Sequence, residues 1–199
     1  MAKVPIILLA AGASSRMGQP KQLLPWDEQT LIEHQIQTLT QSGESVIVVL
    51  GAHADRIWPV VEKYPVTIVL NDDWETGMAG SIACGINEIG LQHPNADGVL
   101  ITLVDQPLIS IGHFNGILNA FEEGCQQIIA STSSEGWLGV PALFDKCYFS
   151  ELQNLQGEKG AKTLIQQYPN QVKALKCNEI IRDIDTLESY QDLYQKHFN

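Results

Sequence analysis

Residues 4–26 read VPIILLAAGASSRMGQPKQLLPW, and this stretch joins a strongly apolar run to a segment of small and basic residues. The run 4–9 is apolar throughout, which is typical of a strand buried on both faces of a mainly parallel sheet. The segment that follows leaves the carboxyl end of that strand, where open α/β sheets bind ligands. An irregular loop of ~18 residues in a compact domain is usually functional. We therefore expect a ligand site where the first strand ends.

Four more apolar runs predict further strands, and helical patterns lie between them. Thr30 and Glu33 form a capping-box pattern at the start of a helix that Gly43 ends. A second helix is expected to begin after Ser110 and to end at Gly124. This alternation predicts an α/β fold, a three-layer α/β/α sandwich of Rossmann-like type with a mainly parallel mixed sheet. The four further strands are expected at residues 46–50, 66–70, 99–103 and 128–130.

The pattern loosens after Ser131, where glycines at 136, 139, 157 and 160 separate short segments. We expect a strand near 172–175 and a last helix from about Thr186. The sequence contains no internal repeat that would indicate a repeat architecture. We expect one domain over residues 1–199, in which residues 132–199 elaborate the ligand-binding part, residues 1–131, rather than fold independently.

The charge distribution limits the partners. Twelve Lys and Arg against 23 Asp and Glu leave a net charge of −11, which argues against nucleic acid or an anionic membrane as a partner. No Lys or Arg occurs from Tyr64 to Asp145, where ten Asp and Glu stand. If the ligand carries phosphate, its charge must be met by Arg16 and Lys21, by a metal ion, or by a C-terminal group, Lys159, Lys162 and Arg182.

The four cysteines, at positions 84, 125, 147 and 177, show no C-x-x-C spacing and are too few for a disulfide scaffold. They indicate the reduced thiols of a cytoplasmic protein. Residues 1–11 also resemble a short signal peptide, but cleavage there would remove the first strand. No run approaches the ~20 apolar residues of a membrane-spanning helix. We expect a cytoplasmic protein without a membrane partner.

Small residues at 10–15 let the backbone approach a ligand closely, so that its amides can donate to phosphate or base atoms. Arg16 and Lys21 add positive charge, and the loop is therefore suited to a triphosphate. Walker A does not fit, because it has four residues between its glycines whereas five separate Gly12 from Gly18. The dinucleotide motif Gly-x-Gly-x-x-Gly does not fit either, because Ser14 stands at its second glycine. Neither a P-loop ATPase nor a nicotinamide dehydrogenase is supported.

The same segment closely resembles the signature L-A-A/G-G-x-S-x-R-M-G-x-x-K of the MobA-like nucleotidyltransferases and continues into their Leu-Leu-Pro. Ala11 makes it similar to the cytidylyltransferases of molybdenum cofactor synthesis, because the guanylyltransferases carry Gly at this position. The resemblance extends in order along nearly the whole chain, which is far more specific than any single motif. The further matches are Asn71 with Trp74, GMAGSI at 77–82, DGVLI at 97–101, DQP at 105–107, GVPALF at 139–144, GEKGAK at 157–162 and DIDT at 183–186.

The resemblance implies a GT-A-like nucleotidyltransferase that transfers CMP from CTP, or the corresponding group from another NTP, to the phosphate of molybdopterin with release of pyrophosphate. It implies that residues 1–131 bind the nucleotide and that residues 132–199 bind the acceptor and close the site. The catalytic candidates are Arg16, Lys21 and Asp105. The expected nucleotide contacts are Leu9, Ala10, Ala11, Gly12, Ser14, Ser15, Arg16, Lys21, Gly80 and Ser81.

Nucleotidyl transfer brings phosphates together, and unit charges 4 Å apart repel by roughly 4 kcal/mol at an effective dielectric of 20. We expect Mg²⁺, held by one or two carboxylates, to offset this repulsion. Asp105 ends an apolar run beside the first loop, and the resemblance makes it the family's metal-binding aspartate; an Asp that opens a turn before Pro107 is the structural alternative. Asp183 or Asp185 is the second candidate ligand, although Asp185 with Glu188 also fits a helix cap.

Departures from the family pattern lie on the acceptor side. Many relatives carry His or Asn where this chain has Val140, and Arg where it has Lys162. Lys159 and Lys162 are the candidate acceptor-binding residues, as point charges on a terminal phosphate. The identity of the acceptor molecule therefore stays open. A sugar or polyol phosphate is the first alternative, and a non-catalytic nucleotide-binding factor that matures a molybdoenzyme is the second.

Overall fold

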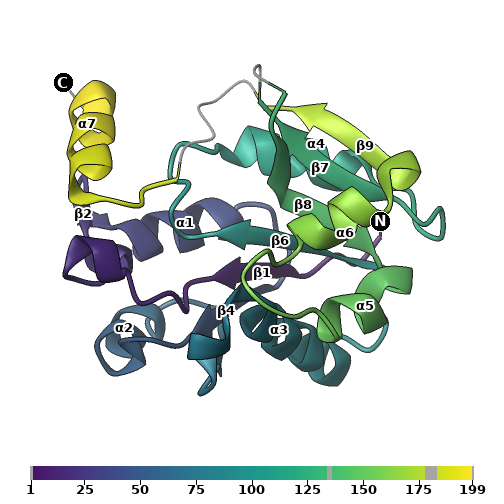
Figure 1. Ribbon diagram of the computed structural model, residues 1–199, viewed down its shortest axis with the longest axis horizontal. Coiled ribbons are helices and arrows are strands. Elements are labelled where there is room, and N and C mark those ends of the chain that lie inside the picture. The colour runs from purple at the N-terminus through teal and green to yellow at the C-terminus, as the bar shows by residue number, and fades with distance from the viewer. Residues whose placement is uncertain (1, 134–135, 178–182, 199) are drawn as a thin grey trace.

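Seven strands form one mixed sheet in the computed structural model, which describes residues 2–133, 136–177 and 183–198. Their order across the sheet is β5-β4-β1-β6-β8-β7-β9 (Figure 1). Two further strands, β2 and β3, pair as a separate short ribbon. The bounds are Ile6–Leu9 for β1, Pro25–Trp26 for β2, Gln29–Thr30 for β3, Val46–Leu50 for β4, Thr67–Leu70 for β5, Gly98–Leu103 for β6, Ile128–Thr132 for β7, Leu138–Asp145 for β8 and Val172–Lys176 for β9.

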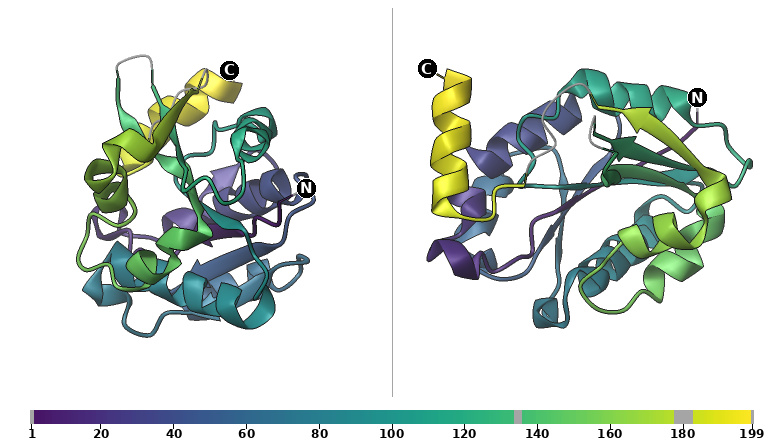
Figure 2. Two further views of the ribbon diagram at one scale, coloured as in Figure 1. Left: turned by 90° about the vertical axis from the view of Figure 1, so that its right-hand side faces the viewer. Right: turned by 45° about the horizontal axis from the view of Figure 1, so that its top comes forward.

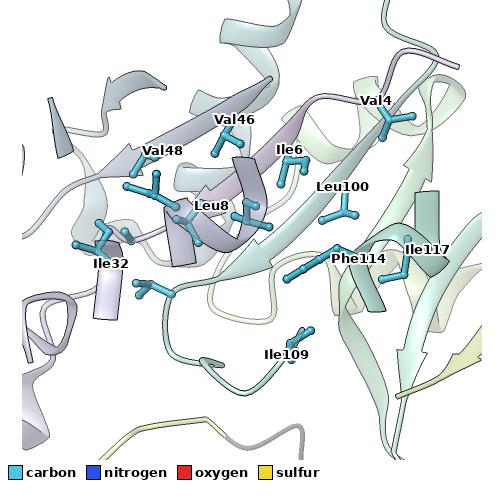
Figure 3. Close-up of a cluster of buried hydrophobic side chains, with 14 of the residues drawn as sticks. Val4, Ile6, Leu8, Ile32, Val46, Val48, Leu100, Ile109, Phe114 and Ile117 are labelled. Carbon is cyan, nitrogen blue, oxygen red and sulfur yellow. The ribbon is translucent and has the colours of Figure 1, made fainter. Parts of the chain in front are cut away.

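Helices cover both faces of this sheet. Along β1, Ile6 and Leu8 pack toward α1, α2 and α4 (Figure 3), whereas Ile7 and Leu9 pack toward α3, α5 and α6. This alternation follows from the two-residue period of a strand, and it confirms the three-layer sandwich. The helices are α1 (Leu31–Thr40), α2 (Ala54–Val61), α3 (Met78–Gln92), α4 (Ile111–Ala120), α5 (Phe149–Gln153), α6 (Lys162–Gln167) and α7 (Leu187–Phe198).

The helix signals of the sequence are confirmed in part. Thr30 and Glu33 form the capping box of α1, with both reciprocal hydrogen bonds present. Ser110 stands at the N-cap of α4, but its side chain makes no capping hydrogen bond. That helix ends at Ala120, before the expected stop at Gly124. The difference at the end of α4 amounts to one turn and leaves its buried residues in place.

The expected strands all form, and the mainly parallel sheet is confirmed: β5, β4, β1 and β6 run parallel to one another. No sequence pattern predicted β8, which lies between β6 and β7 and is antiparallel to both. Its first half contains Gly139 and Pro141, which are rare inside central strands because they weaken the ladder. The pairing with β7 shifts register at this point, between Ala130 and Ser131. The described residues of both 1–131 and 132–199 join this one sheet.

A third apolar cluster ties the C-terminal segment to the loop after β1. Ile184 and Leu193 pack with Met17 and Trp26, and Ile184 is fully buried. Figures 1 and 2 show α7 standing at one end of the molecule. The chain segment just before this helix is thereby held near the carboxyl ends of the central strands.

The tight packing of α3 on β1 yields a stability prediction. A Cβ atom at Gly85 would lie 2.7 Å from Cδ1 of the fully buried Ile7, whereas one at Gly90 on the same helix would meet nothing within 4 Å. Gly85→Ala should therefore lower the free energy of unfolding by about 1 kcal/mol or more, because overpacking outweighs the gain in helix propensity. The matched variant Gly90→Ala should raise it by up to about 1 kcal/mol. Urea denaturation of both variants measures these changes, and equal effects would contradict the packing described.

Candidate functional site

A pocket of about 390 Å³ lies at the carboxyl ends of β1 and β6. The loop after β1 forms one wall, the end of β6 forms the floor, and the start of α3 forms the opposite side. Neighbouring parallel strands end at the same edge of a sheet, which is why these segments meet. The lining residues are 9–16, Lys21, Gln22, Trp74, Glu75, Gly77, Met78, Ser81, 103–105 and Glu158.

Three carbonyl groups of the loop after β1 already accept hydrogen bonds within the protein. Gln22 Nε2 donates to the carbonyl oxygens of Ala10, at 2.7 Å, and Gly12, at 3.0 Å. The N–H of Ala52 donates to the carbonyl of Ala11 at 3.0 Å. By contrast, the N–H groups of residues 11–16 donate no hydrogen bond to another described residue.

The backbone of this loop also turns in a way that gathers its amides. Ser14 adopts the left-handed conformation, with φ 54° and ψ 35°. Successive N–H groups around such a residue form a concave anion-binding nest. The loop is therefore rich in N–H groups without a partner among the described residues, and these groups can donate hydrogen bonds to phosphate oxygens.

Charged side chains alternate in sign across the pocket. Lys21 Nζ makes a close ion pair with Asp105 Oδ2. The same ammonium group lies 3.7 Å from Asp185 Oδ1, and Arg16 Nη1 lies 3.4 Å from Asp185 Oδ2. Arg16 is largely exposed, whereas Lys21 and Asp105 are nearly buried. Two cations and two carboxylates thus form one connected row from the loop to the end of β6.

The segment 183–185 reaches Asp105 through its backbone. The N–H of Ile184 donates to the carbonyl of Asp105 at 3.0 Å, while the Ile184 side chain is buried in the third apolar cluster. Asp183 is fixed separately, because Gln106 Nε2 donates to its Oδ1 at 2.8 Å. Both aspartates of the DIDT motif therefore flank a buried isoleucine and lie near Asp105.

Burial raises the pKa of Asp105 above its usual range. The positive charge of Lys21 acts in the opposite direction, and the negative charges of Asp183 and Asp185 add to the increase. The second oxygen of this carboxyl group, Oδ1, is buried and has no hydrogen-bond partner in the described structure. A buried carboxylate oxygen without a partner requires a donor or a cation.

These residues fit a hard divalent cation. Mg²⁺ takes oxygen ligands and is usually held by one or two carboxylates, with water and substrate phosphate as its other ligands. Asp105 offers the unpartnered oxygen, and Asp185 and Asp183 supply a second carboxylate nearby. Within the described residues, no group of three or more His, Cys, Asp or Glu side chains forms a cage that would hold a metal by itself.

The structure brings most of the candidate residues together. Residues 9–12, Ser14, Ser15, Arg16, Lys21, Ser81 and Asp105 all line the pocket. Gly80 is not among the lining residues; a Cβ atom there would lie 2.8 Å from Thr76 Oγ1, so it serves close packing. Lys159 and Lys162 are exposed and lie outside the lining. Arg182 falls outside the described residues.

Several pocket residues were missed by the sequence analysis. Gln22 follows Lys21 directly, and Trp74 belongs to a motif that was noted without a role. Glu158 reaches the pocket because Gly157 accepts a hydrogen bond from the N–H of Ala79, at 3.2 Å, which docks this segment on the start of α3. Neither the hydrogen bonds of Gln22 nor the docking of Glu158 had a local signal, since both depend on contacts made only in the folded structure.

A Rossmann-like sandwich that carries an amide-rich loop beside a buried carboxylate defines a class of nucleotide-handling enzymes. The chain belongs to the MobA-like NTP transferase domain family, whose model matches residues 6–172. The family resemblance is thereby confirmed, and the protein is a nucleotidyltransferase. In the described part of the chain, no helix is both long and apolar enough to cross a membrane.

Relatives cover nearly the whole chain. Nicotine blue oxidoreductase of Paenarthrobacter nicotinovorans is 31% identical over 191 residues, which is 92% of each chain. Molybdenum cofactor cytidylyltransferase of Escherichia coli is 27% identical over 197 residues, or 96% of this chain and 95% of the relative. The purine catabolism protein PucB of Bacillus subtilis is 28% identical over 197 residues, or 92% of each chain.

Solved structures share the fold. The Rv0371c homologue from Mycobacterium sp. strain JC1 superposes with a TM-score of 0.86 at 30% identity and covers 98% of this chain and 96% of its own. Rv0371c of Mycobacterium tuberculosis in complex with manganese has a TM-score of 0.82 at 26% identity and covers 98% of this chain and 99% of its own.

The raised pKa of Asp105 predicts a stability cost at neutral pH. Because its pKa is higher in the folded protein than in the unfolded chain, stability is lost as the pH rises above the ordinary carboxyl range. Asp105→Asn should therefore raise the melting temperature of the metal-free protein near neutral pH, with the difference vanishing below about pH 3.

Asp97→Asn is the matched control for this measurement. A hydrogen bond from the N–H of Lys3 lowers the pKa of Asp97, so its charged form stabilises the fold at neutral pH. This substitution should lower the melting temperature near neutral pH. Thermal unfolding followed over a pH series measures both variants, and destabilisation by Asp105→Asn at neutral pH would contradict the first prediction.

Proposed function

We propose that this protein is a Mg²⁺-dependent cytidylyltransferase that transfers CMP from CTP to the phosphate of molybdopterin and releases pyrophosphate. The observation that carries this proposal is the row of alternating charges from Arg16 to Asp105 beside a loop with free N–H groups. The E. coli relative named molybdenum cofactor cytidylyltransferase, which aligns over 96% of this chain, supports the choice of substrates.

In this proposal the loop and the two basic residues bind the triphosphate. The N–H groups of residues 11–16 donate to phosphate oxygens, Lys21 contacts the phosphates from the floor of the pocket, and Arg16 contacts them from its rim. Mg²⁺ supplies charge neutralisation on the phosphate oxygens when it is bound. The acceptor phosphate is already ionised at neutral pH and attacks in line, so the chain needs no general base.

Asp105 and Asp185 are the proposed metal-holding pair. Their carboxylates already share one cation, because Lys21 Nζ pairs with Asp105 and lies 3.7 Å from Asp185 Oδ1. Asp183 is the alternative partner, and its Oδ1 accepts a hydrogen bond from Gln106. The preference for Asp185 therefore rests on proximity to the same cation.

The proposed base subsite lies between the loop and the start of α3. Trp74 and Ala11 close one side of it, since a Cβ atom at Gly51 would lie 2.6 Å from the Trp74 Cβ and 2.9 Å from the Ala11 Cβ. Ser81 faces it from α3, where its hydroxyl accepts a hydrogen bond from Asn71 at 3.0 Å. In this proposal the bulk of the loop at Ala10 and Ala11, which line the pocket, favours a pyrimidine over a purine.

A second candidate function keeps the chemistry and changes the acceptor to a sugar or polyol phosphate. Glu158 lines the pocket, and a carboxylate there can accept hydrogen bonds from hydroxyl groups. Lys159 and Lys162, the proposed contacts of the acceptor phosphate, are exposed beside it.

The four free cysteines support our proposal that the protein works in the reducing cytoplasm, where a molybdoenzyme partner would receive the product of the first candidate function.

The test is pyrophosphate release from each of the four NTPs with Mg²⁺, with and without molybdopterin. Release should require CTP and molybdopterin together, and Asp105→Ala should reduce it by ~100-fold or more because a carboxylate that holds the cation is lost. Chelation of divalent metal should have the same effect. The control is Asp97→Ala, a carboxylate just before the amino end of β6 and outside the pocket lining, which should retain activity.

The other possible outcomes of this assay indicate a different function or mechanism. Release with a sugar or polyol phosphate in place of molybdopterin would favour the second candidate function. CTP binding without release under any of these conditions would indicate a non-catalytic maturation factor. Equal release by wild type and Asp105→Ala would remove Asp105 from the mechanism.

A further inference from the structure

We propose that Gln22 is a positioning residue that sets the direction of the N–H groups in the phosphate-binding loop. This inference rests on the proposed function, because it assigns the loop to the polyphosphate of the substrate. Gln22 follows Lys21 in a short 3-10 turn, Lys21–Leu23, and is fully buried at the edge of the pocket.

The side-chain amide of Gln22 has one possible orientation. Its Nε2 donates to the carbonyl oxygens of Ala10 and Gly12 at 2.7 and 3.0 Å. The reversed amide would place Oε1 against these two acceptor oxygens and leave both without a donor. The amide therefore holds two carbonyl groups of the loop at the same time.

Those two contacts determine where the loop amides point. In a trans peptide unit the C=O and the following N–H point in opposite directions. Holding the carbonyl of Ala10 toward Gln22 therefore directs the N–H of Ala11 away from it, and the same relation applies to Gly12 and Ala13. The hydrogen bond from Ala52 to the carbonyl of Ala11 fixes the peptide unit between them.

The same turn also places the two other groups that face phosphate. The N–H of Lys21 donates to Ser14 Oγ at 3.1 Å, which attaches the far end of the loop to the turn. The side chain of Lys21 extends from the turn to Asp105. Gln22 thus joins the loop carbonyls to the element that carries Lys21, and the removal of its amide should disturb phosphate binding more than base or acceptor binding.

The experiment compares three variants by calorimetric titration with Mg²⁺ and two probes, inorganic pyrophosphate and CTP. Gln22→Met removes both donors at similar length, and Gln22→Glu keeps the shape without the –NH₂ donor. The control, Gln35→Met, alters another buried glutamine, which lies on α1 and outside the pocket lining. Both Gln22 variants should bind pyrophosphate and CTP about tenfold or more weakly, since two hydrogen bonds that hold the loop are lost.

Turnover and stability separate positioning from general damage. The KM for CTP should rise in both Gln22 variants while the KM for the acceptor stays within about twofold. Both Gln22 variants should remain folded at the titration temperature, which thermal unfolding measures; Gln35→Met removes a buried amide that has no hydrogen-bond partner among the described residues, so its melting temperature should not fall. Wild-type affinity for pyrophosphate in either Gln22 variant, or an equal loss in Gln35→Met, would overturn the inference.

The two proposals fail separately. A wild-type protein that binds pyrophosphate but releases none from CTP would refute the proposed function, while the Gln22 comparison would still be decided by binding. A wild-type protein that binds neither probe would refute both. Should Gln22→Met fail to fold, wild-type affinity for pyrophosphate in Gln22→Glu would still overturn the inference, because its added negative charge can only weaken anion binding further.

Discussion

The burial of Asp105 is the constraint on which the site depends. A carboxylate at the end of β6 with little access to water needs positive charge close by, and burial otherwise raises its pKa. No Lys or Arg occurs between Tyr64 and Asp145, so the strand's own neighbourhood cannot provide it. The cation comes instead from the loop after β1, through Lys21. This electrostatic requirement explains why the loop folds across the sheet edge rather than extending into solvent.

The sheet order makes that contact possible. β1 lies between β4 and β6, so the loop that leaves β1 ends beside the carboxylate that ends β6. The C-terminal segment then completes the site from a distance of about eighty residues in sequence. Ile184 is buried among Met17 and Trp26, and its N–H pairs with the backbone of Asp105. A small apolar cluster outside the main core thus fixes the position of the second carboxylate.

The sequence predicted the features that have a local cause. Predominantly apolar runs identified β1, β4 and β6, because a strand buried on both faces contains few polar residues; Thr102 in β6 is the exception. β8 was missed, because Gly139 and Pro141 interrupt its apolar pattern. The strand is stabilised instead by its pairing with β6 and β7. The small and basic residues of the first loop identified the pocket.

The sequence could not show which of those features meet. The approach of Asp185 to Arg16 and the docking of Glu158 on α3 depend on contacts between segments far apart in the chain. Gln22 had no signal at all, because a buried amide that bonds to carbonyl oxygens follows no periodicity. Such polar contacts are specified by three-dimensional geometry alone.

An acidic chain can bind an anionic substrate because the groups that bind it lie close together in one pocket. Most of the net charge of −11 comes from residues 64–145, where ten Asp and Glu stand without a Lys or Arg, and exposed charges are screened beyond ~8 Å at physiological salt. Inside the pocket the charges are closer than that, and Lys21 is nearly buried. The loop N–H groups add hydrogen-bond donors without adding net charge. They can therefore attract phosphate without forming ion pairs with the carboxylates of the site. Recognition therefore depends on a few groups within one pocket, while the acidic surface disfavours polyanions that are too large to enter it.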